Sequence, residues 1–272
     1  MRTVETVTLM NGMKMPMVGT GTNTYGKVDN KYDGALNDDF SALESAIKAG
    51  YRLIDTAIYY RNEVGVGQTI KDSEIARGEF YLTTKIPETD EYVGSKGLVE
   101  QTVLQSLANL QTDYIDLFLI HQPIEDKKTL KRTWEVLESL VDAGKIKSIG
   151  VSNFSIRLLE EMKEYTRIQP AVNQIESNPS NWNNELIDYL KDQAILPEAW
   201  GPLVKVTEEQ RAKLTKIGNK YGKNWGQVLL RYQIQRGVVV IPKSHNKERQ
   251  LSNLDLFNFN LFTEDIQIIE EL

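Results

Sequence analysis

Three apolar runs in the sequence each carry an ionisable group at or near their end. These groups are the carboxylate of Asp55, the ammonium of Lys85 and the imidazole of His121. Such groups are costly to bury without a partner, so their place at the ends of strand-like runs indicates a site. A tyrosine pair, Tyr59 and Tyr60, follows Asp55 within five residues. A phenol beside an amine, a carboxylate and an imidazole is suited to donating a proton to a bound substrate.

The segments around these groups repeat one pattern along the chain: a short apolar run, turn residues, and an amphipathic segment. The apolar runs are 18–21, 53–57, 81–85, 116–121, 147–153, 171–176, 195–200 and 238–243. Several are almost continuously apolar, as is typical of strands that are buried on both faces of a parallel sheet. Between them, the span 129–143 places Leu130, Trp134 and Leu137 at helical spacing, and Gly144 follows as a stop signal.

Eight alternations of strand and helix favour a closed barrel over an open sheet. We therefore predict an α/β fold, a single (β/α)₈ TIM barrel that forms one domain over residues 1–272. The residues that flank Asn11-Gly12 predict an N-terminal β-hairpin that plugs the lower end of the barrel. Extra C-terminal helices are expected over 247–254 and from 263 onward.

The composition excludes several classes of function. Of 272 residues, 40% are hydrophobic and 26% charged, which is enough for a packed core. The 38 acidic residues outnumber the 32 basic ones, which argues against non-specific nucleic-acid binding. The absence of cysteine excludes disulfides and thiolate chemistry, and two histidines make a metal site improbable. With no signal peptide and no apolar stretch near the roughly 20 residues that span a bilayer, we expect a cytoplasmic monomer that does not bind membranes.

Six ordered motifs resemble those of the aldo-keto reductase family. Residues 55–63 read Asp-Thr-Ala-Ile-Tyr-Tyr-Arg-Asn-Glu, and the blocks at 83–85, 119–121, 150–154, 172–176 and 241–244 follow in the family's order. The similarity covers nearly the whole chain and extends to bacterial members such as diketogluconate and glyoxal reductases. It implies that the chain reduces aldehydes or ketones to alcohols with hydride from NADPH, so that its partner is a small carbonyl compound.

The resemblance also implies a catalytic tetrad, and it is the motif that selects Tyr60 over Tyr59 as the general acid. A free tyrosine titrates near about 10, and a nearby ammonium such as Lys85 favours the phenolate and is expected to lower that value. Asp55 would hold Lys85 in place. His121 would either orient the carbonyl or assist its protonation. Taken singly, the same residues are also consistent with structural roles.

No G-x-G-x-x-G dinucleotide fingerprint is present; Gly19 and Gly21 supply only G-x-G. The resemblance implies an NADPH/NADP⁺ molecule extended across the barrel mouth. Around the nicotinamide, Trp200 would stack on the ring, its carboxamide would be bound by Ser152, Asn153 and Gln174, and the same region would be lined by Gly21, Thr22 and Asn23. The pyrophosphate would be flanked by Gly201 and Leu203. At the other end of the cofactor, the 2′-phosphate would be held by Lys243, Ser244 and Arg249, and adenine would be contacted by Asn253. Two cations at the phosphate favour NADPH over NADH.

The loop after residue 203 is short, because a helical pattern begins near Thr207. Candidate substrate-pocket residues are Tyr25, Tyr59, Ile86 and Trp182, each of which could equally be a packing residue. Two other functions are compatible with the motifs. One is a lyase with Lys85 as a Schiff-base nucleophile, which a nearby Asp55 opposes. The other is a barrel that binds NADPH as a sensor without turnover.

Overall fold

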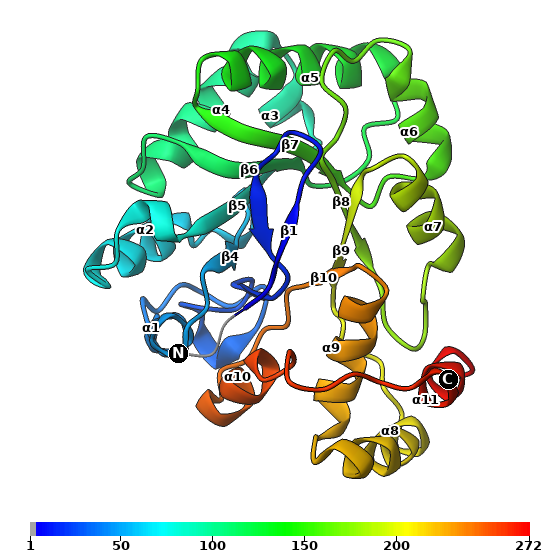
Figure 1. The fold of residues 1–272 in the computed structure, drawn as a ribbon. Coiled ribbons are helices and arrows are strands. Elements are labelled where there is room, and N and C mark those ends of the chain that lie inside the picture. The colour runs from blue at the N-terminus through cyan, green and yellow to red at the C-terminus, as the bar shows by residue number, and fades with distance from the viewer. Residues whose placement is uncertain (1–3) are drawn as a thin grey trace.

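Eight short parallel strands form the centre of the molecule in the computed structural model, which describes residues 4–272. Consecutive strands are neighbours throughout (Figure 1). The strands are β3 (Gly19–Gly21), β4 (Leu53–Asp55), β5 (Tyr81–Ile86), β6 (Ile115–Ile120), β7 (Ile146–Ser152), β8 (Val172–Glu176), β9 (Leu196–Trp200) and β10 (Val239–Val240). A parallel bridge between Val18 and Val240 joins the two ends of the sheet. The predicted (β/α)₈ barrel is therefore confirmed.

The eighth strand is shorter than predicted. The sequence pattern extends over 238–243, but only Val239 and Val240 pair as a strand, with Glu198 and Ala199 of β9. Pro242 has no N–H group to donate to a neighbouring strand, so regular pairing cannot continue past it. The chain after Val240 is thus released from the sheet and follows the mouth of the barrel.

Helices lie around the sheet in Figure 1, as alternating strands and helices require. They are α1 (Ser41–Ala49), α2 (Glu63–Asp72), α3 (Asp90–Val93), α4 (Lys96–Asn109), α5 (Lys127–Asp142), α6 (Ile156–Lys163), α7 (Asn184–Asp192), α8 (Glu208–Tyr221), α9 (Trp225–Gln235), α10 (Lys247–Leu254) and α11 (Thr263–Glu270). Helix α5 buries Leu130, Trp134 and Leu137, as their spacing predicts, and begins where Asp126 caps the N–H of Thr129. The two predicted C-terminal helices correspond to α10 and α11.

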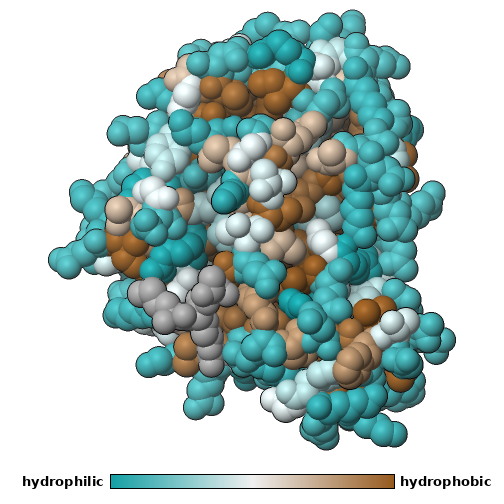
Figure 2. All heavy atoms as spheres, viewed as in Figure 1, coloured by the Kyte–Doolittle hydropathy of each residue, from teal (hydrophilic) through white to brown (hydrophobic). Residues whose placement is uncertain are grey.

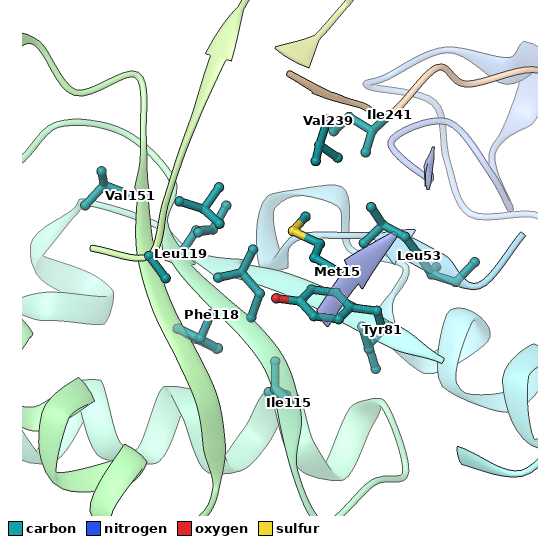
Figure 3. Packing of buried hydrophobic residues seen from close by; sticks show 14 of the residues in the cluster. Met15, Leu53, Tyr81, Ile115, Phe118, Leu119, Val151, Val239 and Ile241 are labelled. Carbon is teal, nitrogen blue, oxygen red and sulfur yellow. The ribbon is translucent and has the colours of Figure 1, made fainter. Parts of the chain in front are cut away.

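The N-terminal hairpin consists of β1 (Thr6–Thr8) and β2 (Lys14–Pro16), which pair antiparallel. Its turn rests on the barrel, because the Asn11 amide donates to Lys147 O at 3.1 Å and to Ser148 Oγ at 2.8 Å. Met15 is completely buried and lies among the barrel side chains in Figure 3. The hairpin therefore closes the end of the barrel at which the strands begin, as expected.

The face of the molecule that carries the N-terminal hairpin is hydrophilic over much of its surface. Figure 2 shows hydrophilic side chains around the rim of the hairpin face, with hydrophobic ones between them toward the middle. Among residues 4–272, no helix has the length and apolar composition that crossing a bilayer requires.

Candidate active site

A cavity of about 930 Å³ opens at the carboxyl ends of the strands. Four strands contribute their last residues, Gly21, Asp55, Ser152 and Trp200, and β8 contributes Gln174 from its middle. Barrel enzymes carry their chemistry at this end, because the loops there are free to vary while the strands hold the side chains in place. Tyr60 and His121 also line the cavity.

Lys85 lies completely buried below the cavity floor. Its Nζ donates to Asp55 Oδ1 at 2.7 Å, to the carbonyl oxygen of Thr56 at 2.9 Å and to Tyr60 Oη at 3.4 Å. Three ammonium protons thus meet three acceptors, which fixes the side chain. Burial opposes the charge, but Asp55 and Tyr60 raise the pKa of Lys85 above its ordinary value. The ammonium is therefore permanent at neutral pH.

Tyr60 ends a single 3₁₀ turn, Ile58–Tyr60, that follows β4. Since its oxygen accepts a hydrogen bond from Lys85, its own proton remains available to a molecule in the cavity. Burial raises the pKa of Tyr60 to about 12, and the opposing effect of Lys85 does not overcome it. The expectation that Lys85 lowers the tyrosine pKa below its free value is therefore wrong for this geometry. The phenol is fully protonated at neutral pH.

His121 lies edge-on to Tyr60, with ring centroids 5.7 Å apart and the planes at 82°. Burial, and then the charge of Lys85, lower the pKa of His121 to about 3. Its Nδ1 is buried and has no hydrogen-bond partner among the residues that the structure describes. The imidazole is therefore neutral, and it is a hydrogen-bonding group rather than a charged acid.

The structure brings together all but one of the residues predicted to bind a cofactor. Those that line the cavity are Gly21, Asn23, Ser152, Asn153, Gln174, Trp200, Gly201, Leu203, Lys243, Ser244, Arg249 and Asn253. Thr22 does not line it. Its side chain is fully buried, and its carbonyl oxygen accepts a hydrogen bond from the amide of Asn62. Thr22 therefore supports the cavity wall from behind.

Two amides hold the wall near Tyr60 in one arrangement. Asn153 adopts a left-handed backbone with φ of 62°, and its Oδ1 accepts from Trp200 Nε1 at 2.8 Å, which fixes the indole plane. Gln174 donates its Nε2 to Asp55 Oδ2 at 2.8 Å and to Glu198 Oε2 at 2.7 Å. Because both neighbours are carboxyl oxygens, the amide nitrogen must face them. Gln174 is left with its carbonyl oxygen as the group available to a ligand.

The opposite end of the cavity is cationic. Lys243 and Arg249 both line it, and no carboxylate among residues 4–272 forms an ion pair with either. Burial against the cavity wall lowers the pKa of Lys243. Two unpaired cations with the hydroxyl of Ser244 nearby are suited to an anion such as a phosphate.

None of the four predicted substrate-pocket residues is among those that line the cavity. Trp182 packs on Tyr232 of α9, with ring centroids 4.9 Å apart. Tyr25 is fully buried and donates to Ser244 O at 2.9 Å. Ile86 belongs to the hydrophobic core, and the hydroxyl of Tyr59 points to Glu88. Their places follow from side-chain direction, which sequence position alone does not give.

Other residues take their place. Tyr32 and Gln122 line the cavity, and the Tyr32 ring lies 5.9 Å from that of Tyr60. Arg211 of α8 and Trp225 of α9 form the wall beside the 201–204 loop, with the guanidinium 5.0 Å from the indole centroid. No sequence signal marks Arg211 and Trp225, because they reach the cavity only through the packing of α8 and α9 beside that loop.

Comparisons with known proteins agree with this architecture. A model described as the aldo/keto reductase family matches residues 17–272. The chain is 44% identical to the glyoxal reductase of Bacillus subtilis, over 98% of this chain and 92% of that protein. The crystal structure of an aldo/keto reductase from Brucella melitensis superposes with a TM-score of 0.89 at 38% identity, covering 99% of each chain. A Bombyx mori aldo-keto reductase in complex with NADP gives a TM-score of 0.87 at 33% identity, over 98% of this chain and 92% of that one.

Proposed function

Since the chain belongs to the aldo/keto reductase family, we propose that it reduces aldehydes or ketones with NADPH and that Tyr60 supplies the proton. The observation that carries this proposal is the hydrogen bond from Lys85 Nζ to Tyr60 Oη at 3.4 Å. It leaves the phenolic proton directed to other acceptors, beside the neutral imidazole of His121. A carbonyl oxygen in the cavity is such an acceptor.

The proton is transferred from Tyr60 as negative charge develops on the carbonyl oxygen. Although the phenol of the free site has a pKa of about 12, Lys85 stabilises the phenolate that the transfer leaves behind. Asp55 keeps Lys85 within reach by its 2.7 Å ion pair. Tyr60 thus keeps its proton before the reaction. The Lys85 ammonium acts mainly after proton transfer, when it stabilises the phenolate.

His121 orients the carbonyl by a hydrogen bond. Its pKa of about 3 argues against the protonated form as acid at neutral pH, which supports orientation over the alternative of direct protonation. Its position edge-on to Tyr60 allows both side chains to approach one carbonyl oxygen.

The cavity fits NADPH. When bound, NADPH supplies the hydride that reduces the carbonyl carbon. Trp200, held by Asn153, offers a fixed aromatic face for the nicotinamide, and the free carbonyl oxygen of Gln174 is an acceptor for the carboxamide. Lys243 and Arg249 lack carboxylate partners among residues 4–272, and they bind the 2′-phosphate that distinguishes NADPH from NADH. The site draws on residues from Gly21 to Asn253, which supports a single domain over the part of the chain that the structure describes.

The substrate is a small carbonyl compound, such as an α-dicarbonyl or a ketoaldehyde. The name of the B. subtilis relative, glyoxal reductase, supports this class. Tyr32, Gln122 and His121 surround the place next to Tyr60 and offer both aromatic and polar contacts. The lyase alternative is disfavoured, because Lys85 is completely buried and each of its protons already has an acceptor.

The test is NADPH oxidation, followed by absorbance, with methylglyoxal, nitrobenzaldehyde and diketogluconate as substrates. We expect turnover with NADPH well above that with NADH, and little turnover by Tyr60→Phe. If the wild-type protein binds NADPH but reduces none of these compounds, the enzymatic proposal fails and the sensor alternative gains support.

A further inference from the structure

Glu198 is a carboxylic acid in the middle of the barrel that the proposed reaction does not use. It lies on β9, paired in register with Gln174 of β8 and Val239 of β10, and it is completely buried. It is not among the residues that line the cavity, so it contacts neither a bound cofactor nor a substrate there. A fully buried glutamate in an apolar strand is costly and calls for a physical explanation.

Hydrogen bonds connect Glu198 to Tyr60 in four steps. Glu198 Oε2 accepts from Gln174 Nε2 at 2.7 Å, and the same nitrogen donates to Asp55 Oδ2 at 2.8 Å. The other oxygen of Asp55 accepts from Lys85 at 2.7 Å, and Lys85 donates to Tyr60 Oη. The amide nitrogen of Gln174 thus links the carboxyl groups of Glu198 and Asp55. It binds the Asp55 oxygen that Lys85 does not contact.

The charges of this group balance only if one carboxyl carries a proton. Within residues 4–272, the cation that directly contacts the pair is Lys85, which lies 2.7 Å from Asp55. Asp55 therefore takes the negative charge. Two buried carboxylates that share one site cannot both ionise without strong repulsion, which leaves Glu198 as the neutral member. In agreement, burial and then the charge of Asp55 raise the pKa of Glu198 to about 8.

We propose that Glu198 is a positioning residue of the reductase site, a neutral acid that anchors Gln174 and through it holds the Asp55 carboxylate against Lys85. By this contact it also fixes which atom of Gln174 faces the cavity, because the amide nitrogen is committed to the two carboxyls. The expected effect of Glu198 on catalysis rests on the proposed function. The protonation state of Glu198 can be tested without it.

Three titratable groups from strands β4 and β5 interact with Glu198 across the barrel. Asp55 of β4 and Lys85 of β5 are described above, and Tyr81 of β5 has a buried hydroxyl whose pKa is raised, chiefly by burial. Because its pKa is raised to about 8, Glu198 changes charge in this range. Its ionisation places a second negative charge beside Asp55, and the repulsion disturbs the shared amide of Gln174. We therefore expect wild-type kcat to fall above pH 8.

Thermal stability gives a test that needs neither cofactor nor substrate. Glu198→Gln keeps an acceptor for Gln174 but cannot ionise. The folded-state pKa of Glu198 lies above its unfolded value, so the folded protein binds more protons and wild-type stability falls as pH rises from about 4.5 to 8. We expect the Tm of Glu198→Gln minus that of wild type to increase over this range.

The matched control is Glu138→Gln, which we expect to lack this trend. Glu138 is a buried glutamate on α5 that accepts hydrogen bonds from the Arg167 and Ile168 N–H groups. A difference that stays flat between pH 5 and 8 would overturn the proposal.

Kinetics test the positioning role. At pH 7, Glu198→Gln retains wild-type kcat, and it lacks the decline above pH 8. Glu198→Ala removes the anchor, and we expect kcat to fall by about 10- to 100-fold, as for a displaced catalytic group. Identical pH profiles for wild type and Glu198→Gln would refute the role even if Glu198→Ala does not fold. If the wild-type protein reduces no carbonyl compound, the proposed function fails, while the stability measurement still decides whether Glu198 is neutral.

Discussion

Lys85 donates to Tyr60 rather than accepting from it, at an Nζ–Oη distance of 3.4 Å. The phenolic proton of Tyr60 is therefore not used in the hydrogen bond with Lys85. Burial raises the pKa of Tyr60 to about 12 in the free site, and the charge of Lys85 opposes this only in part. Tyr60 therefore carries its proton over the whole physiological pH range. It donates this proton when the carbonyl oxygen gains negative charge and becomes basic.

Removing the Tyr60 hydroxyl should stop the chemistry but not the binding. We expect Tyr60→Phe to lose about 10²- to 10⁴-fold in turnover, the usual contribution of a general acid, with an unchanged Kd for NADPH. Single-turnover kinetics and fluorescence titration measure the two quantities. Tyr59→Phe is the matched control, since its hydroxyl points to Glu88. Retained turnover in Tyr60→Phe would transfer the acid role to His121.

The preference for NADPH should depend on two cations. Lys243→Ala combined with Arg249→Ala removes the groups that bind the 2′-phosphate, so we expect equal Kd values for NADPH and NADH. Lys247→Ala, which removes an exposed lysine two residues before Arg249 on α10, should leave the preference intact. Unchanged discrimination in the double variant would refute this location for the phosphate.

Arg211 should affect both cofactors alike. It lies over Trp225 in the cavity wall, beside the 201–204 loop where Gly201 and Leu203 would flank the pyrophosphate. We expect Arg211→Ala to raise the Kd for NADPH and for NADH by the same factor, because a pyrophosphate is common to both. Quenching of intrinsic tryptophan fluorescence provides the titration, and Lys213→Ala, which removes an exposed ion pair with Glu209 on the same helix, is the control. A change for NADPH alone would assign Arg211 to the adenosine phosphate instead.

The neutral imidazole of His121 should make the protein acid-sensitive. Its folded-state pKa of about 3 lies below the unfolded value of 6.5, so the unfolded chain binds an extra proton between these values. Stability from this group is complete above pH 6.5 and is lost as pH falls toward 3. Comparing Tm against pH for His121→Asn and its parent, both with His245→Gln, isolates the effect. Parallel curves from pH 7 to 4 would show that the imidazole is not held neutral.

Local patterns were sufficient for the architecture. Apolar runs such as 238–243 and the helical spacing of Leu130, Trp134 and Leu137 predict eight strand–helix units, because periodicity depends on near neighbours. Strand ends meet at one edge of any parallel barrel, so the convergence of Asp55, Lys85 and His121 could be expected as well.

Only the tertiary structure decided the electrostatics and the walls of the cavity. The high pKa of Tyr60 depends on how deeply packing buries it, and the link between Glu198 and Asp55 runs through Gln174, 119 residues from Asp55. The places of Trp182, outside the cavity, and of Arg211, inside it, depend on how α8 and α9 pack beside the barrel. Motifs record which residue types a reaction needs, whereas burial and side-chain direction are sums over contacts between distant segments and exist only once the chain has folded.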